Sequence, residues 1–303
     1  MGKIGFLFPG QGAQTVGMAK QLYETLPAAK QIFDQAGEIL GYDLAEICFH
    51  GPEDKLNSTV VSQPALYVSS MAALEKLKLE KPDVFQACQG AAGLSLGEYT
   101  AIAFAGGVTF EEGLRLVQHR GQAMQEAADE TAGSMVSVIG LDQEQTAKVC
   151  EDARVEGEIL QVANLLCRGN IAVSGHQASC DQVASVAEAA GAMKSIPLSV
   201  AGAFHTPLMN SAIEKLESAL AQVEIKDTRI PVYSNVDASQ HVAGNEFSAL
   251  LVKQVCSPVL WQSSVEKMLE DGFDEFYEVG VGRVLRGIMK RINRKVPCHG
   301  VLE

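Results

Sequence analysis

The chain has 303 residues, of which 47% are hydrophobic and 20% are charged, a composition typical of a globular protein. Its formal net charge of −13 disfavours a nucleic-acid partner, and the absence of a bilayer-length apolar run or a secretion signal predicts a cytoplasmic protein without a membrane partner. The seven cysteines are scattered and form no CxxC pair, so we expect reduced thiols and neither a disulfide framework nor a metal site.

The first third of the chain predicts a buried strand followed by helices. Residues 3–8 form a short apolar run that ends in a glycine-rich loop at 9–14, and helical patterns cover residues 18–25, 28–40 and 64–79. Pro64 suits the first position of the last of these helices. A strand at about residues 88–93, a helix after it and a helix over residues 110–128 complete this part.

The pattern of expected strands and helices changes over residues 131–199. Strands are expected at 135–139, 159–164, 171–174 and 193–198, with helices at 143–152 and 177–190. The order βαββαβ predicts a small ferredoxin-like subdomain. It interrupts a large α/β domain of residues 1–130 and 200–303, which resumes with helices at 207–222, 246–255, 261–271 and 283–292 and strands near Val232 and Phe276. Alternating strands and helices predict a mainly parallel, α/β-hydrolase-like sheet in the large domain.

A serine nucleophile is the first functional candidate. Gly93, Ser95 and Gly97 have the spacing G-x-S-x-G of a nucleophile elbow, in which a serine occupies a tight turn between strand and helix. The alternative is an ordinary glycine-rich turn with a capping serine.

A serine hydroxyl needs a base, and His205 is the candidate among six histidines. Thr206 can cap a helix that begins at Pro207, and the helix dipole would keep the imidazole neutral. Asp227 and Asp237 could orient the histidine, but a dyad held by a backbone carbonyl is the more economical interpretation. The alternative is a loop histidine bonded to backbone.

Charge that develops during acyl transfer needs backbone donors. The N–H of Leu96 at the start of the elbow helix is one candidate, and the N–H of Gln11 in the first glycine-rich loop is another. A generic glycine-rich turn explains the Gln11 loop equally simply.

Arg120 indicates the substrate class. Its neighbours three and four positions away are apolar, including Leu116, Val117 and Met124, so the guanidinium is expected to be buried and paired. Its planar fork would suit a carboxylate of the acyl group. The alternative is an internal salt bridge to a distant acid.

Together these residues resemble the malonyl-CoA:acyl carrier protein transacylase family, and the resemblance covers nearly the whole chain. It rests on the motifs at residues 8–14, 63–66, 93–99, 120–125, 203–205, 235–237, 257–261 and 278–280. The resemblance implies that Ser95 takes the malonyl group from malonyl-CoA as an ester and passes it to the phosphopantetheine thiol of an acyl carrier protein. His205 would be the base and Arg120 would hold the malonyl carboxylate. The resemblance also implies that the chain needs no cofactor, and it favours a monomer.

The same resemblance assigns further roles. The backbone N–H groups of Gln11 and Leu96 would form the oxyanion hole, and the carbonyl of Gln254 would orient the histidine. Supporting and selecting positions in the pocket would be Gln63, Met124, Phe204 and Asn235. The family usually has histidine where this chain has Leu94, which leaves fatty-acid and polyketide pathways open.

A basic segment near the end of the chain is the candidate surface for the carrier protein. Helical spacing places Arg283, Arg286, Lys290 and Arg294 on one face, and carrier proteins are typically acidic. The alternative is a solvated helix face.

Two other functions remain open at this stage. A hydrolase or thioesterase on the same scaffold would release the acyl group to water and would not need Arg120. A non-catalytic scaffold that binds the carrier protein would not need Ser95.

Overall fold

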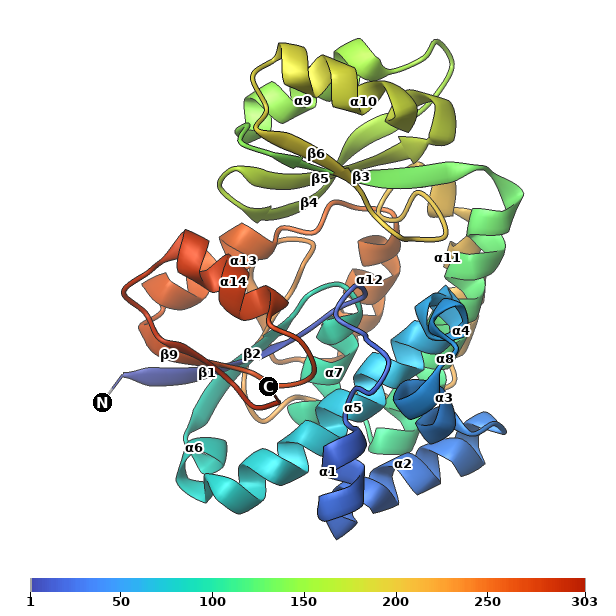
Figure 1. Cartoon of the computed structure of the whole chain (residues 1–303). Coiled ribbons are helices and arrows are strands. Elements are labelled where there is room, and N and C mark those ends of the chain that lie inside the picture. The colour runs from blue at the N-terminus through green and yellow to red at the C-terminus, as the bar shows by residue number, and fades with distance from the viewer. Residues whose placement is uncertain (1, 303) are drawn as a thin grey trace.

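The computed structural model describes residues 2–302, and its two sheets lie one above the other (Figure 1). The larger sheet has the strand order β10-β9-β1-β2-β7-β8. Its strands are β1 (Lys3–Phe8), β2 (Cys88–Gly93), β7 (Val232–Tyr233), β8 (Gln240–His241), β9 (Phe273–Glu278) and β10 (Cys298–Gly300). All neighbours pair in parallel except β7 and β8. The predicted mainly parallel sheet is therefore confirmed.

Helices cover both faces of the large sheet. The helices outside residues 131–199 are α1 (Lys20–Thr25), α2 (Pro27–Leu40), α3 (Leu44–His50), α4 (Glu53–Asn57), α5 (Thr59–Glu80), α6 (Pro82–Gln86), α7 (Leu96–Phe104), α8 (Phe110–Glu130), η1 (Pro207–Met209), α11 (Ser211–Leu220), α12 (Gly244–Val255), α13 (Trp261–Glu270) and α14 (Val284–Ile292). Along β1, Phe6 and Phe8 pack into the core on one face while Leu7 packs with Trp261 and Leu285 on the other. This alternation follows from the two-residue period of a strand, and burial on both faces explains the uninterrupted apolar run.

The smaller sheet has the order β4-β5-β3-β6 and is antiparallel throughout. Its elements are β3 (Gly133–Ile139), α9 (Gln143–Ala153), β4 (Leu160–Cys167), β5 (Asn170–His176), α10 (Gln177–Ala189) and β6 (Lys194–Pro197). The two helices lie on the face that points away from the large sheet (Figure 1). Asn164 on β4 forms a bridge to Val259, which joins the small sheet through the backbone to the segment between α12 and α13.

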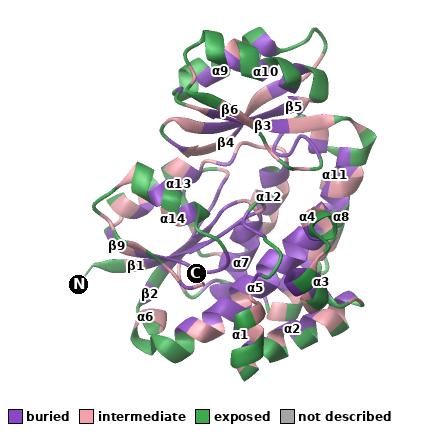
Figure 2. Cartoon of the chain, in the orientation of Figure 1, coloured by how far each residue is buried: buried purple, intermediate pink, exposed green. Residues whose placement is uncertain are grey.

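The burial pattern places the apolar interior around the centre of the large sheet (Figure 2). Helices α5 and α7 are the most thoroughly buried, and every residue of α7 is buried. Because α7 begins at Leu96, inside the G-x-S-x-G motif, a fully buried helix anchors the turn.

Two of the predicted helices differ from the structure. Helix α5 begins at Thr59, so Pro64 lies inside it and not at its first position. The predicted helix at 207–222 is divided into η1 and α11 at Asn210. Helix α14 ends at Ile292, where the predicted helix ends, because Asn293 is extended with φ −148° and ψ 107°.

Among residues 2–302, no helix combines the length and the hydropathy that crossing a membrane requires.

Candidate active site

The site forms where the loops after β1 and β2 leave the same edge of the large sheet. These strands are adjacent and parallel, so their carboxyl ends lie together and bring the Gln11 loop beside the turn at Ser95. A Cβ added to Gly10 would lie 2.3 Å from the carbonyl oxygen of Leu94, and one on Gly97 would lie 2.2 Å from that of Phe8. Only glycine permits these contacts, which explains the glycines of both motifs.

Ser95 occupies a strained turn. Its φ of 51° and ψ of −101° lie outside the regions that L-residues favour, a conformation that costs about 1–3 kcal/mol. The turn is fastened by Asn235, whose Oδ1 accepts from the Ser95 N–H (2.6 Å) and whose Nδ2 donates to Gly93 O (2.8 Å). A Cβ on Gly93 would lie 1.8 Å from the Gly97 backbone. The turn therefore projects the hydroxyl from the start of α7.

His205 lies within hydrogen-bond distance of the nucleophile candidate. Its Nε2 is 2.9 Å from Ser95 Oγ, and its Nδ1 is 2.9 Å from the carbonyl oxygen of Gln254. A carbonyl oxygen can only accept, so Nδ1 carries the proton and Nε2 accepts from the serine hydroxyl. The backbone at His205 is also in the left-handed region, with φ 62°. The arrangement is that of a serine with a neutral base.

Burial is the main cause that keeps this histidine neutral. Desolvation, followed by the nearby Arg120 cation, lowers the pKa of His205 to about 4. Thr206 caps η1 as predicted, with its Oγ1 accepting from Leu208 N at 3.2 Å, but that helix has only three residues. The expected neutrality stands, and its cause is corrected.

Neither aspartate considered as an orienting acid contacts His205. Asp227 accepts from the Gly244 N–H, and Asp237 pairs with His241. A backbone carbonyl holds the imidazole instead, on the side opposite the serine.

Arg120 is buried at 1% exposure and points its guanidinium at the serine. Nη2 donates to Ser95 Oγ (3.0 Å) and to Gln254 Oε1 (3.0 Å), and Nη1 donates to Gln63 Oε1 (2.7 Å). The Tyr99 ring lies 5.4 Å from Cζ. Within residues 2–302, no carboxylate forms an ion pair with Arg120, so the alternative of an internal salt bridge is not observed.

The two predicted backbone donors face the same region. Leu96 is the first residue of α7, and neither its N–H nor that of Gln11 has a hydrogen-bond partner among the described residues. Leu96 is buried, and an unpaired N–H in such a position is costly unless a ligand oxygen accepts from it. Their role as an oxyanion hole stays a prediction.

The remaining predicted pocket residues are buried around Arg120 and His205. Gln63, Asn235 and Gln254 are fully buried, and the Gln63 Nε2 lies 3.6 Å from the sulfur of Met124. Phe204, next to the histidine, is also buried. The unusual Leu94 packs into the apolar cluster with Trp261 and Leu285.

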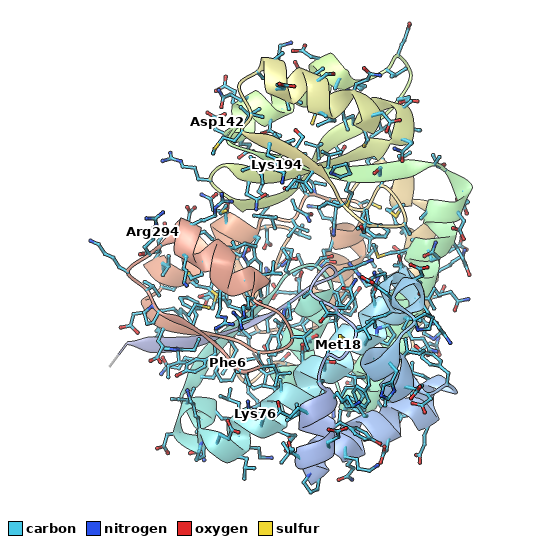
Figure 3. The ribbon with its side chains drawn as sticks, in the orientation of Figure 1. Phe6, Met18, Lys76, Asp142, Lys194 and Arg294 are labelled. Carbon is cyan, nitrogen blue, oxygen red and sulfur yellow. The ribbon has the colours of Figure 1, made fainter. Side chains whose placement is uncertain are left out.

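The basic surface is smaller than predicted. Arg294 lies beyond the end of α14, at the outer edge of the molecule, and does not continue the helical face (Figure 3). Arg286 is half-buried, and its guanidinium lies 3.7 Å from the buried Glu278. Arg283 and Lys290 remain exposed.

Two residues of the site were not predicted. Glu98 is fully buried beneath the elbow and accepts from Gln254 Nε2. Gln161 on β4 donates to the carbonyl oxygen of His205 (3.2 Å) and links the small sheet to the base. A glutamate in the otherwise apolar run of α7 was a signal for the first, whereas the second has no signal in the sequence.

Comparison with known proteins gives the family. Residues 5–296 match the model of the acyl transferase domain. The chain belongs to the acyl transferase family. This acyl transferase is 41% identical over 305 residues to a malonyl CoA-acyl carrier protein transacylase from Bacillus subtilis, with 100% of this chain and 94% of the relative covered. The resemblance found in the sequence is confirmed.

Solved structures agree with this acyl transferase over nearly its whole length. A malonyl CoA-acyl carrier protein transacylase from Coxiella burnetii superimposes with a TM-score of 0.94 at 35% identity, covering 99% of this chain and 94% of that chain. A malonyl-transacylase in complex with a type II polyketide-synthase acyl-carrier protein gives a TM-score of 0.93 at 35% identity, covering 99% of this chain and 96% of that one.

Proposed function

We propose that the protein transfers the malonyl group from malonyl-CoA, through an ester on Ser95, to the phosphopantetheine thiol of an acyl carrier protein. One observation carries the proposal: His205 Nε2 and Arg120 Nη2 both lie within hydrogen-bond distance of the Ser95 hydroxyl. Relatives with the name of this activity, at about 40% identity over the whole chain, support it.

In the first half-reaction, His205 Nε2 takes the proton of the Ser95 hydroxyl while Oγ attacks the thioester carbonyl. The N–H groups of Gln11 and Leu96 stabilise the oxyanion of the tetrahedral intermediate. Collapse of this intermediate breaks the carbon–sulfur bond, and the imidazolium returns its proton to the departing coenzyme A thiolate.

The second half-reaction runs the same steps in reverse with a new thiol. The carrier-protein thiol gives its proton to His205 and attacks the ester carbonyl, and the proton then returns to Ser95 Oγ. No step needs a cofactor, because the chain supplies the nucleophile, the base and the oxyanion donors.

Arg120 would select the malonyl group. Its two Nη atoms bind only neutral oxygens in the free protein, so a malonyl carboxylate exchanges neutral for charge-assisted hydrogen bonds. Gln63 on α5 accepts from the guanidinium and is itself bonded to the Met124 sulfur on α8, and the buried Phe204 would shape the pocket beside the base.

The architecture that we infer is a large α/β-hydrolase-like domain, residues 1–130 and 200–303, with an inserted ferredoxin-like subdomain, residues 131–199. The βαββαβ order and the strand order β4-β5-β3-β6 support the subdomain. A strand–serine–helix elbow at the edge of a parallel sheet supports the comparison with the hydrolases. We propose a monomer that works in the cytoplasm.

We propose Arg283 and Lys290 as the core of a docking surface for the acidic carrier protein. Both are exposed, near or on α14, in a chain of net charge −13. Arg283→Glu with Lys290→Glu should raise the KM for carrier protein and leave acylation by malonyl-CoA unchanged. Lys148→Glu on α9 is the control, and an unchanged KM in the double variant would refute this surface.

The transfer itself is tested by a chase. Malonyl-enzyme, freed of malonyl-CoA, is mixed with carrier protein that carries phosphopantetheine and, separately, with carrier protein that lacks it. The proposal predicts fast movement of the malonyl group to the first protein alone. Equal, fast loss with both proteins would indicate a hydrolase.

A further inference from the structure

The carboxyl group of Glu98 lies in the wall of the site without touching the reacting atoms. It is fully buried on α7, three residues after Ser95. Its Oε2 accepts from Gln254 Nε2 (2.6 Å) and from the Asn235 N–H (3.2 Å), while Oε1 has no hydrogen-bond partner among residues 2–302. Asn235 also holds the turn at Ser95, and Gln254 also accepts from Arg120.

Gln254 connects this carboxyl group to Arg120. Its Nε2 donates to Glu98 Oε2 and to Ser95 O (3.0 Å), so the amide cannot flip without losing both bonds. Its Oε1 therefore faces Arg120 Nη2 at 3.0 Å. The backbone carbonyl of the same residue holds His205. Gln254 thus connects Glu98 and Arg120 through its side chain, and it holds His205 through its backbone carbonyl.

In the described part of the chain neither Glu98 nor Arg120 forms a salt bridge, and each is the oppositely charged group that acts on the other. Within residues 2–302, Arg120 bonds to neutral oxygens, and Glu98 bonds to the neutral donors of Gln254, Asn235 and Ser234. A buried charge is costly unless a charge of opposite sign balances it. Through the amide of Gln254, each of these groups is the balancing charge for the other.

We propose that Glu98 is the resident countercharge of the Arg120 clamp and a positioning residue for Gln254, and that binding of an acyl carboxylate at Arg120 makes Glu98 take up a proton from solvent. This inference rests on the proposed function, because it needs the malonyl carboxylate at Arg120. A second anion in the same buried site would repel the first, and protonation of Glu98 removes that repulsion.

The titration of Glu98 supports this proton uptake. Burial raises its pKa to about 7, against the lowering effect of its hydrogen bonds and of Arg120 on α8. Asn235 and Gln254, from the segment after β7 and from α12, are neutral, and Tyr99 beside it on α7 has its own pKa raised to about 12. At pH 7 the carboxyl group is therefore about half ionised in the free protein, and an added anion raises its pKa further.

Calorimetry on the Ser95→Ala variant tests the proposal without turnover. Malonyl-CoA and acetyl-CoA are titrated at pH 7 into the variant in two buffers of different ionisation enthalpy. We expect uptake of about half a proton with malonyl-CoA in excess of that with acetyl-CoA. Ser95→Ala with Glu98→Gln should show no excess, and Ser95→Ala with Glu111→Gln, which removes an exposed acid on α8, should keep it.

A second measurement separates charge from mere packing. At pH 8, where Glu98 is mostly ionised, Glu98→Gln should raise the ratio of malonyl-CoA affinity to acetyl-CoA affinity by about threefold or more. A structural role alone would weaken both ligands equally.

The outcomes also separate this inference from the proposed function. Preference for malonyl-CoA over acetyl-CoA without excess proton uptake would overturn the role of Glu98 and leave the clamp intact. Equal affinity for the two thioesters would instead refute Arg120 as the carboxylate clamp. If Glu98→Gln does not fold, the comparison of ligands in Ser95→Ala still decides the question.

Discussion

The substitution Arg120→Gln tests the carboxylate clamp, because it removes the charge and keeps a polar side chain. A charge-assisted hydrogen bond is worth about 1.5–3 kcal/mol, and each neutral bond released on substrate binding is worth about 1 kcal/mol. For two contacts the net gain is about 1–4 kcal/mol, and a value near 2.5 kcal/mol corresponds to a factor of about 70. We therefore expect the ratio of kcat/KM for malonyl-CoA to that for acetyl-CoA to fall by about 70-fold.

The ratio of the two kcat/KM values is the appropriate measurement, because the other effects of removing Arg120 slow the reactions of both substrates. Arg120 also donates to Ser95 Oγ, so its removal slows acylation by either thioester. Burst acylation of Ser95, followed by intact-protein mass spectrometry, gives both rates directly. Arg115→Gln is the matched control on the same helix, because Arg115 is exposed and pairs with Glu111 on the surface. An equal fall for malonyl-CoA and acetyl-CoA would refute the clamp.

Three further predictions concern the elbow, the base and a helix cap. Gly97→Ala places a Cβ 2.2 Å from a backbone carbonyl oxygen of β1 and should destabilise the fold by about 1–3 kcal/mol in chemical denaturation, whereas Gly287→Ala, with open space around it, should be neutral or stabilising. His205, with a pKa of about 4, must be neutral to accept a proton, so the burst rate should fall only as the pH drops through about 4. Arg120→Gln removes a cation that lowers this pKa and should move the fall in burst rate to higher pH. A fall at the same pH in the variant would contradict the effect of Arg120 on His205. Thr109→Ala removes the capping box of α8 and should cost about 1 kcal/mol of unfolding free energy, with no change in the malonyl-to-acetyl ratio.

The central residues of the site could be predicted because each leaves a local mark in the sequence. The spacing of Gly93, Ser95 and Gly97 reports a close backbone approach, and the apolar neighbours of Arg120 report its burial. The four strands and two helices of residues 131–199 were also predicted in the right order.

The parts that could not be predicted depend on long-range contacts. Gln161 reaches His205 only because β4 packs beside the loop before η1, and no local pattern encodes that approach. The cause of the low His205 pKa is burial and a cation from another helix, which the sequence around Thr206 does not report. Likewise, helical spacing placed Arg294 on a helix that the extended Asn293 ends.

The central claim is that Ser95 carries a malonyl group during the reaction. Intact-protein mass spectrometry after mixing with malonyl-CoA tests it most directly, with peptide mapping to locate the adduct. We predict a persistent malonyl adduct on Ser95 that is absent in Ser95→Ala and much weaker in Arg120→Gln. An adduct with acetyl-CoA but none with malonyl-CoA, or a malonyl adduct that survives in Ser95→Ala, would contradict it.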